Sequence, residues 1–311
     1  MTQPAQTPTQ PPVPFRSGFV GIVGRPNVGK STILNHYLGR TISIATPVPQ
    51  TTRHKILGIL SRPDAQVIFV DTPGIHDPMH ALGKYMVRTA MAVLEEVDLL
   101  LAVVDARRGL QLEDRRVLEA VKTAKRPAFF VANKIDGVKH KAKVLPLIEE
   151  AQRFGCFRDY FPVSALRGDQ MDVLLQHIVQ ALPPGPSWYE ASQRTDRSME
   201  FQIGELIREQ VLRHTRQEVP HAVAVQVERV EDKPEQGVQV IYATIVAERD
   251  TQKGILIGKG GQLLKAIGEA ARHQIETLVG RRVFLQLWVK AAGEWRDDPQ
   301  QLKEFGYTGE G

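Results

Sequence analysis

The chain has 311 residues, 24% of them charged and 42% hydrophobic, with a net charge of +5, which is typical of a globular protein large enough for two domains. Its single cysteine, Cys156, excludes an intrachain disulfide and a zinc site built from several cysteines, and we expect a buried, unreactive thiol. There is no apolar run of the roughly 20 residues that a membrane helix needs and no signal-peptide pattern at the N-terminus, so we expect a cytoplasmic protein.

The first half of the chain alternates between strand-like and helix-like segments. Residues 1–16, rich in Pro, Gln and Thr, predict a disordered lead-in. Predicted strands then cover 19–24, 56–61, 66–71, 98–105, 127–133 and 160–164, and predicted helices cover 30–38, 82–96, 111–124, 141–153 and 169–182. This order predicts an α/β domain over residues 17–183, with a mostly parallel sheet, helices on both faces, and ligands bound beyond the carboxyl ends of the strands.

The sequence GRPNVGKS follows the first predicted strand and fits G-x-x-x-x-G-K-[ST], the phosphate-binding loop (P-loop). The glycines let the backbone N–H groups face a pyrophosphate at a helix N-terminus. We expect Lys30 to reach the β- and γ-phosphates and Ser31 to bind Mg²⁺. The predicted nucleotide-binding residues of this loop are Gly24, Arg25, Pro26, Asn27, Val28, Gly29, Lys30, Ser31 and Thr32.

Two further segments suit a γ-phosphate and its metal ion. The polar segment SIATPVPQTTRHK should be mobile, and one of its threonines is expected to bind Mg²⁺ only when a γ-phosphate is present. Thr52 is favoured, with Thr51 as the alternative. The next strand ends in DTPG, where Asp71 suits Mg²⁺ and the Gly74 N–H suits the γ-phosphate. The predicted site therefore includes Asp71, Thr72, Pro73 and Gly74, with Ser31, Thr52 and Asp71 as metal ligands.

The strand end FFVANKID predicts the base that is bound. The Asp136 carboxylate can accept two hydrogen bonds side by side, which guanine offers and adenine does not, so GTP is favoured over ATP. Lys134 would lie along the base, and Asn133 would tie this loop to the P-loop. Further on, an exposed backbone N–H within Ser164, Ala165 and Leu166 is expected to contact the guanine O6.

The second half begins after a Pro-rich linker at residues 184–198. Residues 199–311 read helix, strand, strand, helix, G-x-x-G, helix, strand, followed by a C-terminal tail. This order predicts a small α+β type II KH domain, whose G-x-x-G loop clamps about four single-stranded nucleotides. The predicted RNA-binding residues are Ile257, Gly258, Lys259, Gly260, Gly261, Lys265 and Arg281.

The charge distribution is uneven. Residues 1–184 hold 23 Lys and Arg against 16 Asp and Glu, whereas residues 185–311 hold 17 against 19. Bulk charge alone would place a polyanion on the first half. Within residues 251–290, however, seven basic side chains accompany two acidic ones, and we expect this cluster to surround the clamp.

The ordered set GRPNVGKS, QTTR, DTPG, NKID and SAL resembles a GTPase of the TrmE–Era class, and its combination with a KH domain resembles the Era family over about residues 18–308. Ile75 stands where Ras-like proteins carry a glutamine, and the resemblance implies K⁺ held partly by Asn27 in its place, although Arg25 and Asn27 could equally be ordinary turn residues. The catalytic candidates are Lys30, Asn27, Thr52 and Gly74. His76 is interpreted as a surface-loop histidine.

The family implies a partner and a role. These are 16S ribosomal RNA bound near its 3′ end, assembly of the 30S subunit, and weak peripheral association with the inner membrane face. We further expect a monomer, slow intrinsic turnover, and RNA and GTP binding coupled by about 1–3 kcal/mol. The rivals are a GTPase that serves another pathway, such as tRNA modification or membrane traffic, and a non-enzymatic RNA-binding protein.

Overall fold

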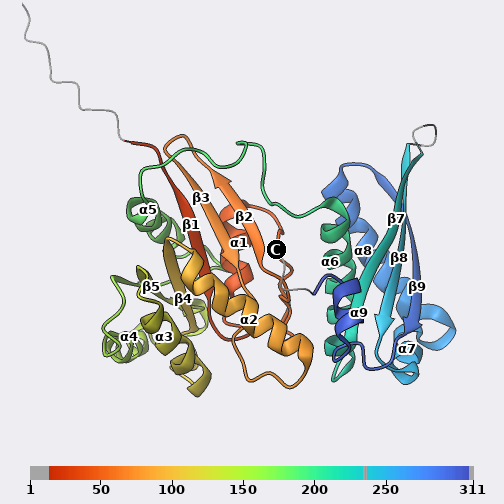
Figure 1. Ribbon diagram of the computed structural model, residues 1–311, viewed down its shortest axis with the longest axis horizontal. Coiled ribbons are helices and arrows are strands. Elements are labelled where there is room, and N and C mark those ends of the chain that lie inside the picture. The colour runs from red at the N-terminus through yellow and green to blue at the C-terminus, as the bar shows by residue number, and fades with distance from the viewer. Residues whose placement is uncertain (1–13, 234, 236, 308–311) are drawn as a thin grey trace, which may run out of the picture.

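A computed structural model describes residues 14–233, 235 and 237–307 of the chain. It contains two units side by side, the first built on a six-stranded sheet and the second on a three-stranded sheet (Figure 1). Residues 1–13 of the predicted lead-in lie outside the described part, but the first strand already begins at Arg16, inside the range predicted as disordered. Among the described residues, no helix is long and apolar enough to cross a membrane.

The sheet of the first unit has the strand order β2-β3-β1-β4-β5-β6. All neighbouring pairs are parallel except β2 with β3. Its central strands are apolar almost throughout because helices cover both faces of the sheet. The strands are β1 (Arg16–Val23), β2 (Ile56–Ser61), β3 (Ala65–Asp71), β4 (Leu99–Asp105), β5 (Ala128–Asn133) and β6 (Asp159–Pro162).

Two hydrophobic cores lie on the two faces of this sheet. α1 and α5 cover one face, and α2, α3 and α4 cover the other. The predicted α/β fold is confirmed, and every predicted helix and strand of this unit ends within three residues of its observed bounds. The helices are α1 (Lys30–Leu38), α2 (Ala81–Glu96), α3 (Leu112–Ala124), α4 (Val144–Gln152) and α5 (Met171–Ala181), with short 3₁₀ turns η1 (Ile135–Gly137) and η2 (Lys141–Lys143).

The second unit has the predicted KH element order, which is confirmed. β7 and β8 are antiparallel, β8 and β9 are parallel, and α6 and α8 cover one face of the sheet. A tail with a short helix then returns to the boundary between the units (Figure 1). The elements are α6 (Met199–His214), η3 (Val219–Ala222), β7 (Val223–Lys233), β8 (Val238–Ala247), α7 (Asp250–Ile257), η5 (Lys259–Gly261), α8 (Gln262–Val279), β9 (Arg282–Ala291) and α9 (Pro299–Glu304).

The linker between the units is fastened to the first sheet. The Gln66 side-chain oxygen accepts the backbone N–H groups of Trp188 and Tyr189 at 2.7 and 3.0 Å, and the Ile59 N–H donates to the Arg194 carbonyl at 2.8 Å. These bonds hold the linker along β2 and β3. The prediction of a buried thiol is wrong in degree, because Cys156 follows α4 at the surface and is only half-buried.

Candidate nucleotide site and RNA-binding loop

The P-loop connects β1 to α1, and packing requires two of its glycines. A Cβ on Gly29, whose φ is +100°, would lie 2.3 Å from the Asn133 side-chain nitrogen. A Cβ on Gly24 would lie 2.5 Å from the Val103 carbonyl oxygen. No larger residue fits either position, so the main chain keeps its N–H groups open toward a ligand at the start of α1.

Lys30 lies under this loop with its ammonium group buried. Its Nζ donates to the carbonyls of Gly24 and Arg25 at 3.1 and 3.0 Å. Burial lowers its pKa to about 8, although the nearby Asp71 carboxylate acts in the opposite direction. The two acceptors of this ammonium group are neutral carbonyls. Phosphate oxygens that entered the loop would pair with it as anionic acceptors and favour its charged form.

The three predicted metal ligands meet beside Lys30. The Ser31 hydroxyl donates to Asp71 Oδ2 at 2.6 Å and lies 2.9 Å from the Thr52 hydroxyl. Asp71 Oδ1 is buried without a hydrogen-bond partner among the described residues, and burial raises the pKa of this carboxyl. Two hydroxyls beside a carboxylate that has one unpaired oxygen are the kind of oxygen ligands that suit a hard cation such as Mg²⁺.

The two candidate threonines differ in orientation. The Thr51 hydroxyl donates to the Val48 carbonyl at 2.7 Å and lies 2.7 Å from the Thr46 hydroxyl, within its own loop. Thr52, in contrast, faces Ser31. The structure therefore favours Thr52 over Thr51 as the residue beside the metal position.

The segment after β3 packs against the P-loop. A Cβ on Gly74 would lie 2.5 Å from the Pro26 nitrogen, and the Ile75 N–H donates to the Gly24 carbonyl at 3.2 Å. The Thr72 hydroxyl is buried and donates to a β1 carbonyl at 2.8 Å. His76 is half-buried, and its Nδ1 lies 2.7 Å from the Gly74 oxygen. A displacement of this segment would therefore also displace the P-loop.

The predicted base-binding loop is tied to the P-loop, as expected for Asn133. Its side-chain nitrogen donates to the Val28 carbonyl at 2.9 Å, and Lys134 donates to the Asn27 carbonyl. The Ser164 hydroxyl donates to Asp136 at 2.6 Å, which holds that carboxylate in place. A cavity of about 770 Å³ opens between the P-loop and Lys134, within the usual range for small-molecule sites. Asp136 is not part of its lining, which includes Arg25, Pro26, Asn27, Gly29, Thr32, Arg107 and Lys134.

The predicted exposed amide is wrong for two of its three candidates. The Ser164 N–H donates to the Asp169 carbonyl, and the Ala165 N–H donates to the Asn133 side chain, both at 3.0 Å. The turn that closes after β6 uses these groups internally. Leu166, whose side chain is exposed, is the remaining candidate.

Two supporting carboxylates were missed by the sequence reasoning. Asp105, at the end of β4, lies 3.1 Å from Lys134 Nζ and holds it beside the P-loop. Asp114, on α3, lies 3.0 Å from Arg25 Nε, so the Arg25 side chain anchors the loop to α3. The signal for Asp105 was an acid at the tip of a buried strand, the same pattern that identified Asp71.

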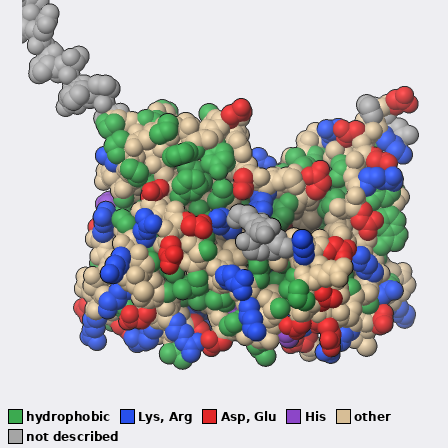
Figure 2. Space-filling model, viewed as in Figure 1, with side chains coloured by type: hydrophobic (Ala, Val, Ile, Leu, Met, Phe, Trp, Pro, Cys, Tyr) green, Lys and Arg blue, Asp and Glu red, His purple; other side chains and the backbone are tan. Residues whose placement is uncertain are grey.

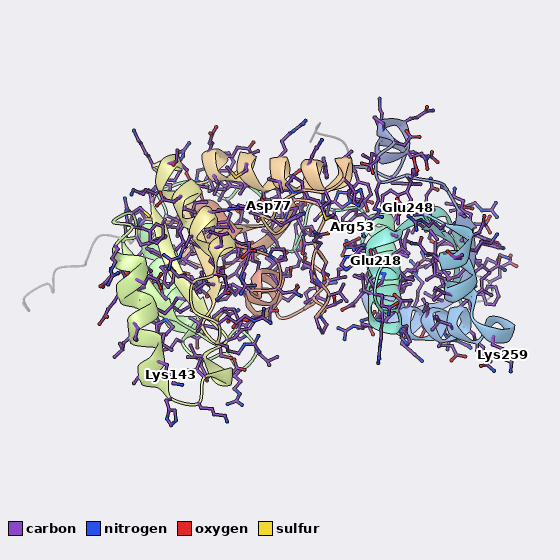
Figure 3. All side chains as sticks on the ribbon, turned by 90° about the horizontal axis from the view of Figure 1, so that it is seen from below. Arg53, Asp77, Lys143, Glu218, Glu248 and Lys259 are labelled. Atoms are coloured by element: carbon purple, nitrogen blue, oxygen red, sulfur yellow. The ribbon has the colours of Figure 1, made fainter. Side chains whose placement is uncertain are left out.

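The G-x-x-G loop lies at the far end of the second unit, where Figure 3 labels Lys259. Lys259 and Gly260 are exposed, and Gly258, Gly260 and Gly261 all have positive φ angles. Ile257 ends α7 directly before the loop, and Lys265 lies one turn into α8 with its side chain exposed. These residues form one surface.

Arg281 does not belong to that surface. It follows α8, whose 18 residues place it about 27 Å from the loop, and it pairs with Asp232 at 3.1 Å. The predicted basic cluster around the clamp is therefore spread along α8 and β9. Figure 2 likewise shows Lys and Arg side chains scattered among acidic and apolar ones on the visible face.

The sequence matches two protein families in the order of its two units. Residues 19–134 match the family described as 50S ribosome-binding GTPase, and residues 218–296 match the KH domain family. GTPase Era of Lacticaseibacillus paracasei is 50% identical over 292 residues, which cover 94% of this chain and 97% of that protein.

Two solved structures are similar over nearly the whole chain. A variant of Era from Aquifex aeolicus, bound to GDP and AlF4⁻, has 39% identity and a TM-score of 0.91, covering 94% of this chain and 100% of that one. An Era structure with MgGDPNP and nucleotides 1506–1542 of 16S ribosomal RNA has 39% identity and a TM-score of 0.92, covering 94% of this chain and 99% of that one.

Proposed function

Because this chain belongs to the Era family of GTPases, we propose that it hydrolyses GTP in a Mg²⁺-dependent reaction and couples this cycle to the binding of RNA. The observation that carries the proposal is the cluster of Ser31, Thr52 and Asp71 with a buried, unpaired carboxylate oxygen next to a packed P-loop. Such a site is complete only with a cation and a phosphate present. A non-enzymatic RNA-binding protein would have no use for it.

Each residue has a defined task in this proposal. Lys30 and the P-loop amides bind the phosphates, and Asp136 selects guanine. Thr52 and the Gly74 N–H report the γ-phosphate. Ser31, Thr52 and Asp71 would hold Mg²⁺, which would supply positive charge against the charge that develops on the phosphates.

The apolar Ile75 cannot orient the attacking water, so we propose that K⁺ supplies positive charge in this site. Asn27 is its candidate ligand, because its amide nitrogen donates to the Pro47 carbonyl at 2.7 Å and its oxygen is the atom left to bind a cation.

The proposed RNA partner is 16S ribosomal RNA near its 3′ end, with a role in assembly of the 30S subunit. The Era complex with nucleotides 1506–1542 supports this, as does the exposed G-x-x-G loop opening onto α8. We propose that Ile257, the loop glycines, Lys259 and Lys265 contact the RNA. Cytoplasmic location, peripheral membrane association and a monomeric state stay predictions.

The test is multiple-turnover phosphate release from GTP, in K⁺ and in Na⁺, with and without an RNA fragment from the 3′ end of 16S ribosomal RNA. We expect slow turnover that requires Mg²⁺, is faster in K⁺ than in Na⁺, and loses this preference in Asn27→Ala. Equal rates in the two salts would contradict the role of K⁺. No phosphate release, despite tight RNA binding, would support the non-enzymatic rival instead.

A further inference from the structure

Two adjacent residues of the first unit, Thr52 and Arg53, point in different directions: one toward the proposed metal position and the other into the second unit. The Thr52 hydroxyl lies 2.9 Å from Ser31 Oγ and 3.5 Å from Asp71 Oδ2, at the proposed metal position. The next side chain, Arg53, leaves the first unit altogether and enters the second. Figure 3 labels Arg53 at the junction between the two units.

Arg53 is held there by main-chain oxygens of the KH unit. Its guanidinium donates to the carbonyls of Val223 at 2.6 Å, His221 at 3.1 Å and Pro220 at 3.4 Å, and to the Tyr307 hydroxyl at 3.3 Å. Only 3% of the residue is exposed. Withdrawing this buried guanidinium would break all of these hydrogen bonds together, so its docked position is strongly favoured over any other.

The KH unit also holds the residue on the other side of Thr52. Arg208, buried in α6, donates to the Thr51 carbonyl at 2.5 Å and is itself fixed by two hydrogen bonds of 2.7 Å that it donates to the Glu205 carboxylate. Both neighbours of Thr52 are therefore bonded across the boundary between the units.

The residue after Arg53 adds an aromatic contact. The His54 ring stacks on Tyr307 with centroids 4.7 Å apart and meets the Phe201 ring edge-on at 5.2 Å. Phe201 lies on α6 and Tyr307 in the C-terminal tail. Thus the Thr51 carbonyl and the Arg53 and His54 side chains all contact the second unit, whereas the Thr52 side chain faces the proposed metal position.

We propose that the docked KH unit holds Thr52 in position to sense the γ-phosphate, with Arg53 and Arg208 as positioning residues of the GTP site. This inference rests on the proposed GTPase function and names its regulation. Thr52 cannot retreat from the metal without pulling Arg53 out of its buried set of acceptors. Conversely, a KH unit that undocks releases Thr52, so docking favours GTP over GDP. The exposed RNA loop stays at the opposite end of the unit (Figure 3).

The test compares the affinities of the full chain for MgGDPNP and for MgGDP. We expect Arg53→Ala to lower the MgGDPNP affinity about tenfold, because the interdomain hydrogen bonds that hold Thr52 at the metal position are lost. Its MgGDP affinity should change less than about twofold. A merely destabilised GTPase unit would lose both affinities together. Arg53→Lys should recover part of the loss, since an ammonium reaches fewer of the carbonyls.

Arg213→Ala is the matched control. Arg213 lies on α6, as Arg208 does, and crosses the same boundary as Arg53, donating to the Ala45 carbonyl at 3.3 Å, but its side chain is 47% exposed and does not flank Thr52. We expect its affinity ratio to equal that of the unmodified chain. An equal loss in Arg213→Ala would show that general docking, rather than the position of Thr52, sets the ratio, and would overturn the proposal.

A double-mutant cycle with Thr52→Ala decides whether Arg53 acts through Thr52. If it does, adding Arg53→Ala to Thr52→Ala leaves the MgGDPNP affinity nearly unchanged. A second tenfold loss would overturn the positioning role. If the unmodified chain shows no preference for MgGDPNP over MgGDP, this refutes the proposed sensing of the γ-phosphate by Thr52, together with the positioning role of Arg53. A normal preference that Arg53→Ala leaves intact refutes the positioning role alone.

Discussion

The two glycine-rich loops of this protein look alike in sequence and differ in their surroundings. Both precede a helix and both use glycines with positive φ. At Gly29 a Cβ would lie 2.3 Å from Asn133. In the G-x-x-G loop a Cβ on Gly258 would lie 2.8 Å from Leu263, but at the exposed tip, Gly260 and Gly261, it would meet nothing within 4 Å. The P-loop is closed by packing and suits one ligand of fixed size. The G-x-x-G loop is open and suits a polymer that continues past it on both sides.

The largest effect is expected from Gly29→Ala. The added Cβ would collide with the Asn133 side chain, and the alanine backbone would have to adopt a left-handed conformation. Both the P-loop and its link to the base-binding loop would therefore be displaced. We expect GDP affinity, measured by isothermal titration calorimetry, to fall by at least about 100-fold, which corresponds to about 2.7 kcal/mol.

Gly39→Ala is its control. Gly39 also has a positive φ, at the end of α1, but a Cβ there would meet nothing within 4 Å. It should therefore lower stability by about 1–2 kcal/mol while leaving GDP affinity unchanged. Equal losses of GDP affinity in the two variants would show that packing is not what distinguishes the closed loop.

A smaller effect is expected from Lys259→Ala in the open loop. The exposed ammonium suits a phosphate contact, so RNA affinity should fall about tenfold and the slope of log affinity against log salt should weaken by about 0.7. Arg281→Ala should have little effect on either quantity, because Arg281 is paired with Asp232 far from the loop. Filter binding of the 16S fragment over a salt series measures both. A larger loss in Arg281→Ala would contradict our placement of the RNA surface.

The smallest expected effect is a pH dependence of GDP affinity, which arises from Lys30 in the P-loop and has no counterpart in the G-x-x-G loop. Lys30 has a pKa of about 8, and a bound phosphate favours its protonated form. GDP affinity should thus fall about fourfold from about pH 7 to about pH 8.5. In the nucleotide-free protein the sign is opposite: above about pH 8 the unfolded chain retains a proton that folded Lys30 has lost, so the free energy of unfolding rises with pH.

Lys30→Arg separates Lys30 from other titrating groups. Its guanidinium stays charged across this range, so GDP affinity in the variant should be lower but independent of pH. The same fourfold fall in Lys30→Arg would assign the titration to another group.

The sequence was sufficient where the chemistry lies in short contiguous strings at strand ends. GRPNVGKS, DTPG and NKID each follow a strand whose position comes from the hydrophobic pattern, so their convergence at one edge of the sheet follows from the parallel topology. It was insufficient where position depends on packing between distant segments. The acceptors of Arg53 come from η3, the start of β7 and the tail, and no local pattern connects them. Arg281 was misplaced because a count of charges ignores the length of α8.

The bonds that fasten the linker have a consequence for how the two units can separate. The last backbone hydrogen bond from the linker to the sheet is accepted by the Arg194 carbonyl, and α6 begins at Met199, so the five residue steps between them span at most about 18 Å. A KH unit that leaves its docked position therefore remains confined beside β2, at an effective concentration of about millimolar or above. Redocking is an intramolecular event whose rate does not depend on protein concentration, and dilution in the cell cannot uncouple the two units.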